Sequence, residues 1–540
     1  MKKALSLLLA MLMLLSLAAC GNNGGTSDGG AASSGAASSD GGYDINEEVN
    51  VNADDETVAE KKTEAGWLVV GVTTASVGFD PTADQNYYGI PYTYDSLFTY
   101  DDEGNIVPLL AKEYEWVDDT HLKITLQDAT FSSGNPITSE DVIYSMQRYF
   151  TKGSRWNTYF TSIDFENTEI VDEKTFILAY SEVTGCAMSY LATRHTSVLE
   201  KAYVENGAED CLWANFSASG PYTCIENVSG SHFILQRRDD YWGEKPEAEF
   251  IKVVFYSETT TLMVDYENGA IDLAIGITDN DVERVKAGSV EHTNLVVKGY
   301  YNQFALCLPE YMEIFNDVRV RQAISLAVDS DTIAEAVFGN LQKPSTSTIP
   351  ADVTYQKEIG RHEYDPEKAL QLLEDAGVDP SSITLRMVVV NFPHLVKMAE
   401  AIQAYLEVIG ITLTIEPYAQ PVAVSYFQAC DTDMVLNNNA EGCITGDPDQ
   451  WYNTTKDNST NGSVRITDAD YNSYVYAGQF SLDPEVRAEA YANAQQWHAE
   501  NYRMIPICDG LQAYVYKDYI DYCGCYTPLQ MNFRTLSFVD

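Results

Sequence analysis

Basic residues are scarce in this sequence: 33 Lys and Arg stand against 80 Asp and Glu among 540 residues, a formal net charge of −47. A surface this acidic repels phosphates, and no Lys or Arg cluster offsets it, so nucleic acid is excluded as a partner. The same charge opposes electrostatic docking on an anionic membrane. Because 45% of the residues are hydrophobic and only 21% are charged, the chain is nevertheless suited to folding. Its length predicts two or three domains.

Catalytic and metal-binding motifs are also lacking. The part of the chain expected to fold contains no G-x-S-x-G nucleophile elbow, no H-E-x-x-H helix and no phosphate-binding loop. The histidines show no metal-ligand spacing. They are His121, His195, His232, His292, His362, His394 and His498. We therefore predict no catalytic residues, no metal and no cofactor.

Two alternatives of other classes stay open. A secreted glycoside hydrolase needs two carboxylates facing each other about 5–10 Å apart, and a sequence this acidic does not reveal such a pair. A binder of a nickel chelate or of haem is the other alternative, although the histidine pattern does not favour it.

Only one apolar run bears on a membrane, and it lies at the N-terminus. Lys2 and Lys3 precede an almost unbroken apolar run over residues 4–17. A transmembrane helix needs about 20 apolar residues, so this run is typical of a signal peptide over residues 1–20. The run ends in Leu17-Ala18-Ala19-Cys20, which resembles a bacterial lipobox. We expect lipidation of Cys20 to hold the protein on the extracytoplasmic face of the bacterial cell membrane.

The segment after Cys20 is dominated by small and polar residues. Residues 21–62 include the tract GGAASSGAASSDGG. Such a composition predicts a flexible tether without a core of its own, which lets a globular body reach away from the bilayer.

Nine further cysteines are spread over the folded part, without a CxxC pair or zinc spacing. An odd number leaves at least one unpaired in a monomer. Structural thiols or one or two bridges are expected, with the pairing open. The nine are Cys186, Cys211, Cys224, Cys307, Cys430, Cys443, Cys508, Cys523 and Cys525.

Hydrophobic periodicity predicts strands and helices from Gly66 onward. Residues 67–72 form an apolar run typical of a buried strand, and residues 122–126 alternate as a half-buried strand. Thr138 followed by Asp141 predicts a helix start. The stretch from residue 67 to residue 300 is richer in strands than the stretch that follows.

The second half of the chain alternates between helical and strand patterns. Helices are expected near 320–328, 366–376 and 395–409, with strands over 385–390, 411–415 and 434–436. This β-α-β spacing predicts a mixed, partly parallel α/β domain over roughly 301–504. Asp483-Pro484 begins another helix, and the last strand covers 505–515.

Six short motifs follow one another in order: Phe79-Asp80-Pro81; Tyr94-Asp95-Ser96-Leu97-Phe98 with Ile106-Val107-Pro108-Leu109-Leu110-Ala111; Ile137-Thr138-Ser139-Glu140-Asp141-Val142 with Ser145-Met146-Gln147-Arg148; Ser219-Gly220-Pro221-Tyr222 with Asp240-Tyr241-Trp242-Gly243; Val318-Arg319-Val320-Arg321-Gln322-Ala323-Ile324; and Tyr364-Asp365-Pro366-Glu367-Lys368-Ala369 with Ala376-Gly377. In this order, behind a lipobox, they resemble the family 5 extracellular solute-binding proteins of ABC importers. That family includes oligopeptide-, dipeptide- and nickel-binding proteins, and the resemblance spans residues 65–540.

The resemblance implies a two-lobed, periplasmic-binding-protein-like α/β fold of class II, in its large form with an extra subdomain and mixed sheets. Lobe I would take residues 63–300, with a subdomain near 96–214, and the return segment 505–540. Lobe II would take residues 301–504, and the ligand would lie in the cleft between the lobes. The expected partners are the permease subunits of an ABC transporter, with the protein itself a monomer.

The ligand contacts are expected after the strand at 434–436, because ligands of open α/β sheets lie beyond the carboxyl ends of strands. Peptide binders of the family carry an aromatic-x-Ala-Asp-Tyr segment there, whose Asp pairs with the ligand amine. This chain has Ala440-Glu441 instead, behind Asn437, Asn438 and Asn439 and ahead of Asp447-Pro448. Glu441 is therefore the candidate partner of a peptide amine.

The departure from the family segment leaves the ligand open between a short peptide and a carbohydrate or other polar solute. Tyrosines supply rigid amphipathic walls for such a cleft. Tyr87, Tyr88, Tyr92 and Trp451 are candidates because they lie near the expected strand ends.

Overall fold

The computed structural model describes residues 47–51, 66–73, 78–83, 86–101, 103–206, 217–361, 363–438, 445–522, 525–527, 530–531 and 533–539. Cys20 and most of the predicted tether lie outside these residues. The exception is β1 (Glu47–Val51), which pairs antiparallel with a long strand of the main sheet. This strand lies within residues 21–62, and the tether over that segment stays a prediction. Its alternating Val49 and Val51 favour an extended edge strand over a flexible linker.

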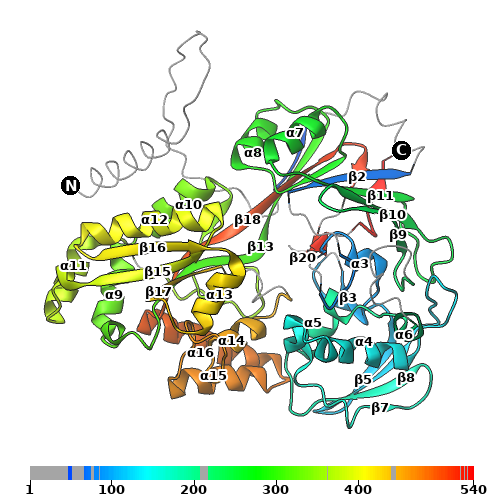
Figure 1. The fold of residues 1–540 in the computed structure, drawn as a ribbon, viewed down its shortest axis with the longest axis horizontal. Coiled ribbons are helices and arrows are strands. Elements are labelled where there is room, and N and C mark those ends of the chain that lie inside the picture. Colours follow the sequence, from blue (N-terminus) through cyan, green and yellow to red (C-terminus); the bar gives the residue numbers. More distant parts are fainter. Residues whose placement is uncertain are drawn as a thin grey trace, which may run out of the picture.

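A twelve-stranded sheet runs through the molecule in the order β16-β15-β17-β13-β18-β12-β2-β11-β10-β9, with β1 and β14 (Gln342–Pro344) as side branches. Its centre is the antiparallel pair β13 (Thr293–Cys307) and β18 (Met504–Lys517). β17 pairs with residues 304–307 of β13, at one end of this ladder. β12 pairs with residues 514–516 of β18, at the opposite end. The two long strands therefore belong to both halves of the molecule, as Figure 1 shows.

The pairing of β13 with β18 is interrupted where the halves meet. The register shifts between Gly299 and Gln303 and again between Phe304 and Ala305. Tyr301 lies in this break with a φ of 55°, a conformation that costs a residue with a Cβ energy. The predicted lobe boundary at residue 300 falls beside this break, and the boundaries as such remain a prediction.

Lobe II, as we define it, is built on β15 (Thr384–Val390), β16 (Thr412–Tyr418) and β17 (Met434–Asn438), where β15 lies parallel to both neighbours. Its core contains the apolar faces of α9 (Val318–Ala327), α11 (Pro366–Asp375) and α12 (Pro393–Val408). Asp365 caps α11 and Pro366 occupies its first turn, as predicted. The β-α-β prediction for this region is confirmed.

A helical layer of lobe II lies next to that sheet. It consists of α14 (Asp449–Thr455), α15 (Ala469–Gln479) and α16 (Pro484–Asn501), around a core that includes Tyr452, Tyr471 and Tyr491. The remaining helices of the lobe are α10 (Ser330–Phe338) and α13 (Gln420–Gln428).

Lobe I contains the other end of the large sheet: β2 (Trp67–Val72), β9 (Tyr222–Val228), β10 (His232–Arg237), β11 (Phe250–Phe255) and β12 (Leu273–Ile275). The apolar run predicted as a buried strand is β2, and it pairs parallel with β11 and β12. Helices α7 (Thr259–Glu267) and α8 (Asp279–Lys286) pack against this sheet through a further core.

The subdomain of lobe I has its own antiparallel sheet, β5-β6-β8-β7, over Ala111–Asp118, His121–Leu126, Thr175–Ala179 and Glu169–Ile170. Helix α4 (Ser139–Thr151) begins at a capping box of Thr138 and Asp141, as the sequence predicts. Shorter elements complete this part: α3 (Ile90–Thr93), β3 (Phe98–Tyr100), β4 (Ile106–Pro108), η1 (Arg155–Phe160), α5 (Ala187–Leu191), η2 (Arg194–Thr196) and α6 (Lys201–Glu205).

Small strands of the C-terminal part return to lobe I. They are β19 (Ile520–Asp521), β20 (Cys525–Thr527), β21 (Gln530–Met531) and β22 (Ser537–Phe538). Five cysteines of the described part are free thiols: Cys186, Cys224, Cys307, Cys430 and Cys508. Within the described ranges no helix is long and apolar enough to span a bilayer.

Candidate functional site: the contact between the lobes

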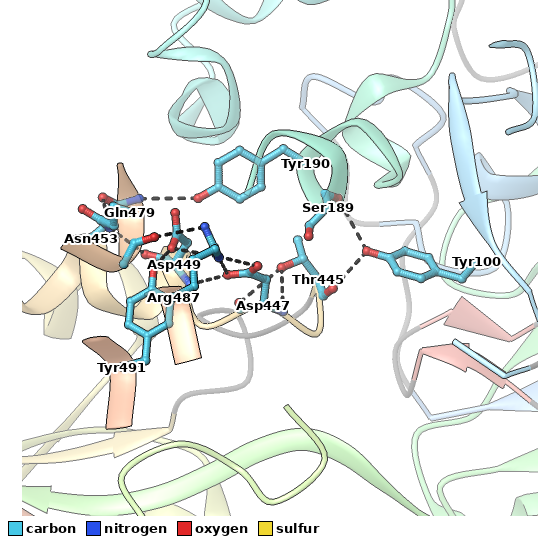
Figure 2. A network of polar contacts seen from close by, with 11 residues as sticks. Tyr100, Ser189, Tyr190, Thr445, Asp447, Asp449, Asn453, Gln479, Arg487 and Tyr491 are labelled. Carbon is cyan, nitrogen blue, oxygen red and sulfur yellow. Dashed lines mark hydrogen bonds and ion pairs between the residues drawn. The ribbon is translucent and has the colours of Figure 1, made fainter. Parts of the chain in front are cut away.

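The subdomain of lobe I touches the helical layer of lobe II through tyrosine hydroxyls (Figure 2). The Tyr100 hydroxyl, at the end of β3, donates a 2.9 Å hydrogen bond to the Thr445 carbonyl. The Tyr159 hydroxyl, in η1, donates a 2.9 Å hydrogen bond to Gln450 Oε1. Both rings are almost completely buried, so water does not compete for these bonds.

Backbone groups add to the same contact. The Gly185 amide donates a 2.8 Å hydrogen bond to the carbonyl of Gln479, the last residue of α15. A Cβ at Gly185 would lie 1.6 Å from Arg487 Nη1 and 2.5 Å from the Ser481 carbonyl oxygen. Glycine is therefore required here for the subdomain to approach lobe II this closely.

Arg487 forms the ionic centre of the lobe II side. Its guanidinium is 2% exposed, and Nη2 lies 2.7 and 2.9 Å from the two carboxylate oxygens of Asp447. The same nitrogen lies 3.4 Å from Asp449 Oδ1, which also accepts a hydrogen bond from the Tyr491 hydroxyl. The guanidinium carbon lies 5.2 Å from the centroid of the Tyr355 ring, so stacking supplements the ion pairs.

Local sequence explains how these groups are presented. Asp447 and Pro448 lie at the start of α14. Asp447 Oδ1 accepts a 3.0 Å hydrogen bond from the backbone amide of Asp449. Asp483 caps α16, so Arg487 lies in the first turns of that helix and faces the start of α14. Two carboxylates and one guanidinium therefore meet in a site from which water is excluded.

Burial is the main electrostatic effect on this cluster. It raises the pKa of Asp449 to about 7, and the neighbouring Asp447 carboxylate raises it further, whereas Arg487 opposes the shift. Burial also raises the pKa of Asp447 against the stabilising charge of Arg487. Burial and the nearby Asp449 raise the pKa of the Cys186 thiol, which faces the cluster from the subdomain. Arg487 thus pairs with two carboxyl groups, and Asp449 is the one that readily takes a proton.

The asparagines predicted as ligand contacts end strand β17. Asn437 pairs with Ala305 and Asn438 with Phe304 of β13, so the strand continues through two residues that were expected in the loop beyond it. Asn437 Nδ2 is buried and has no hydrogen-bond partner within the described residues. Asn439 and Glu441 lie outside the described residues, and their roles as ligand contacts stay predictions.

The predicted aromatic contacts lie in different surroundings. Tyr87 lies under the guanidinium of Arg194, 4.2 Å from ring centroid to guanidinium carbon. Tyr88 and Tyr92 pack with the core of lobe I, where Tyr92 stacks on Phe533. Trp451 is 3% exposed in the core of the helical layer. The surroundings of Tyr92 and Trp451 favour packing, and a ligand contact by these residues stays a prediction.

The other acids near the strand end are engaged within the protein. Asp447 pairs with Arg487. Asp433 Oδ2 accepts a 2.8 Å hydrogen bond from the backbone amide of Arg386. In the described part of the chain no group of three or more His, Cys, Asp or Glu side chains is arranged to hold a metal ion.

Sequence reasoning missed the residues that join the lobes. Tyr100, Tyr159 and Arg487 carry no local motif, and the Tyr100 bond to Thr445 spans 345 positions of the chain. The one available signal is Asp447-Pro448, whose place after β17 does not indicate that Asp447 pairs with Arg487.

Comparisons with known proteins agree with this architecture. The family described as bacterial extracellular solute-binding proteins, family 5 Middle, matches residues 105–463. A Brucella ovis protein described as an ABC transporter peptide-binding protein is 27% identical over 369 residues, covering 65% of this chain and 68% of that protein. Heme-binding protein A of Haemophilus influenzae is 22% identical, covering 72% of this chain and 76% of that protein.

Solved structures share the fold as well. The periplasmic binding protein DppA of Helicobacter pylori, solved with the peptide STSA, superposes with a TM-score of 0.73 at 20% identity. The superposition covers 89% of this chain and all of that one. At this level of identity the likeness concerns the fold alone.

The buried Asp449 predicts a specific pH dependence of stability. An unfolded Asp has a pKa of about 4, so between pH 4 and 7 the folded state binds a proton that the unfolded state has released. We expect this residue to lower the free energy of unfolding as the pH rises from about 4 to 7, and Asp449→Asn to flatten that dependence. Urea unfolding from pH 4.5 to 8, followed by tryptophan fluorescence, measures it.

The exposed Asp239 provides the matched control, since Asp239→Asn makes the same chemical change on the surface of lobe I. Equal pH dependences for the wild type and Asp449→Asn would show that Asp449 does not take up the proton.

Proposed function

The chain belongs to the bacterial extracellular solute-binding proteins of family 5, and we propose that it captures a short peptide and delivers it to an ABC importer. The observation that carries the proposal is the family match to a two-lobed fold whose halves are joined by β13 and β18 and touch across buried hydrogen bonds. The peptide-binding names among its relatives support a peptide as the solute. Because a haem binder is also among them, the peptide is the part of the proposal that most requires a test.

The proposed mechanism is closure of the lobes around the solute. The register break near Tyr301 supplies a place where β13 and β18 can bend, and the tyrosine contacts hold the closed form. A solute shifts the protein towards the closed form only by binding it more tightly than the open form. The protein thus binds its solute and does not convert it.

The solute is proposed to meet both lobes beyond the end of β17. Asn437, Asn438, Asn439 and Glu441 follow in the chain at that point, with Glu441 as the partner of the peptide amine. Tyr87 and Tyr88 are proposed to line the lobe I side. The lobe boundaries 63–300, 301–504 and 505–540, with a subdomain near 96–214, are part of the same proposal.

The proposed location is the extracytoplasmic face of the cell membrane. Cys20 would carry the lipid after removal of residues 1–20, and the tether would let a monomeric body reach the permease subunits. The acidic surface gives no electrostatic attraction to anionic lipid, so the anchor would have to come from the lipid itself.

Removal of a buried cross-lobe hydrogen bond should weaken solute binding. Tyr100→Phe deletes the bond to Thr445, and a bond of this kind is worth about 0.5–1.5 kcal/mol, or a two- to tenfold loss of affinity. Calorimetry with a peptide selected from a tripeptide pool measures the loss, and small-angle scattering should show a smaller radius of gyration with peptide bound.

The matched control is Tyr114→Phe, because Tyr114 is 44% exposed on the subdomain sheet. An affinity of Tyr100→Phe equal to that of Tyr114→Phe would contradict closure through this contact, as would an unchanged radius at saturation.

Glu441→Gln tests the peptide assignment. Leaving a buried amine without its carboxylate costs about 3–5 kcal/mol, which corresponds to a loss of affinity of roughly 10²- to 10³-fold. We expect Glu441→Gln to cause a large part of that loss. Acetylation of the peptide amine should cause a similar loss in the wild type and little further loss in Glu441→Gln. Titration of the free and the acetylated peptide into both proteins gives the coupling.

The exposed Glu335 offers a control, since Glu335→Gln changes the net charge equally on helix α10. If the affinity losses from Glu441→Gln and from acetylation are additive, Glu441 does not contact the peptide amine. If a sugar binds and peptides do not, the solute is not a peptide.

Cys20→Ala should release the protein from the membrane. Without the thiol no lipid can be attached, so the protein is expected in the soluble fraction or to keep its leader uncleaved. Cell fractionation with immunoblotting measures this, and Cys430→Ala, which removes a free thiol of the folded part, should stay with the membrane. Equal membrane retention and processing of both variants would rule out the lipobox.

A further inference from the structure

The buried contact between the lobes holds two acids against one guanidinium (Figure 2). Asp447, Asp449 and Arg487 are 7%, 3% and 2% exposed, so little water reaches them. If both carboxylates were ionised, the site would carry an uncompensated negative charge away from water, which is costly. Since two acids that share one site do not both ionise readily, the pair favours holding one proton.

Lys456, which ends α14, is a further cation that acts on these acids. The residue is half-buried, and its ammonium donates a 3.1 Å hydrogen bond to Gln479 Oε1. Burial raises the pKa of Asp449 more than the charges of Arg487 and Lys456 lower it. This second cation therefore does not replace the proton. Two other charged side chains act on Lys456 itself, the exposed Glu182 and Asp457.

Lobe I covers the cluster at the start of α5. The thiol of Cys186, the N-cap residue of α5, is hydrogen-bonded to the carboxyl group of Asp449. The backbone at Gly185 lies so close to Arg487 that a Cβ would be 1.6 Å from Nη1. Separation of the lobes would remove both contacts and admit water to the acids. Loss of the thiol bond raises the pKa of Asp449 and access of water lowers it, and burial is the larger effect.

Tyrosines and the same thiol complete the surroundings of Asp449. The Tyr491 hydroxyl donates a hydrogen bond to Asp449 Oδ1. Burial raises the pKa of Tyr190 well above its usual value, and it raises the pKa of Cys186 as well. Tyr355 faces the cluster through its ring, which stacks on the guanidinium. A proton taken up near neutral pH is therefore held by the two acids.

We propose that closure of the lobes takes up one proton on the pair formed by Asp447 and Asp449, so that acid favours the closed form and the solute held in it. The proton comes from solvent, forms an O–H bond on one carboxyl oxygen and returns to solvent when the lobes open. This linkage goes beyond solute capture as such, but it rests on the proposed function because it acts on the same closure. The protein would hold its solute more tightly as the outside pH falls and release it more readily as the pH rises.

The direction of the pH dependence follows from the pKa of Asp449 in the two forms. In the closed form burial raises this pKa to about 7. In the open form water returns it towards the usual value for Asp, about 4. Closure therefore binds a proton between about pH 4 and 7, and solute affinity rises as the pH falls across this range.

Calorimetry with a peptide selected from a tripeptide pool tests the linkage. We expect the wild type to bind about tenfold more tightly at pH 5.5 than at pH 7.0 and to take up about one proton per peptide at pH 6. Titrations in buffers with different enthalpies of ionisation measure this uptake. Asp449→Asn should lose both effects, and the exposed Asp239→Asn should keep them. Peptide binding without proton uptake, or uptake that survives Asp449→Asn, would overturn the proposal and leave the proposed function standing.

The chain without solute decides the case in which no tripeptide binds. That result would contradict the peptide assignment and would not bear on the proton. Small-angle scattering of the ligand-free full chain should then give a smaller radius of gyration at pH 5.5 than at pH 7.5 for the wild type. Asp449→Asn should give the same radius at both pH values. An equal radius of the wild type at both pH values would overturn proton-linked closure.

Cys186→Ala covers the case in which Asp449→Asn does not fold. It removes the lobe I donor to the ionised carboxyl group, so the pKa of Asp449 in the closed form and the pH range of proton uptake should both move upward. Cys224→Ala is the matched control, because it removes a buried thiol from the core of lobe I and should leave the range unchanged. Circular dichroism compares the fold of each variant with that of the wild type. An unmoved range in Cys186→Ala would mean that lobe I does not act on Asp449, and would overturn the link to closure.

Discussion

The pairing of β13 with β18 is the constraint on which the rest of this structure depends. Each strand is long enough to serve both lobes, so one antiparallel ladder holds the two halves of the sheet together. A separate linker between lobes would leave their relative position free. A shared pair of strands restricts that position, and the register break near Tyr301 lies where the halves meet.

That restricted geometry explains the chemistry at the contact. Tyrosine hydroxyls, the Gly185 amide and the Arg487 cluster meet in buried surroundings, where a hydrogen bond gains strength and an unpaired group is costly. Glycine at position 185 permits the approach, and Arg487 opposes the rise that burial causes in the pKa of Asp447. Among the residues that the structure describes, the buried Nε and Nη2 of Arg194 have no hydrogen-bond partner.

Much of the fold could be predicted because its elements carry local signals. The capping box at Thr138 and Asp141, the Asp365-Pro366 start of α11 and the apolar run of β2 depend on neighbours a few residues away. The strand β1 shows the limit of such signals. Its five residues lie inside a segment of linker composition, and the partner that makes them a strand is β13, some 240 positions further along the chain.

The family and most of the element order could be recognised from residue order, because motifs and periodicity are properties of short segments. Residue order also predicts an export signal and a ligand contact at Glu441, and both stay predictions. The pairing of Arg487 with Asp447 and the bond from Tyr100 to Thr445 could be read from the folded molecule alone. These contacts depend on distances between segments up to 345 residues apart, which packing of the lobes sets and no local pattern records.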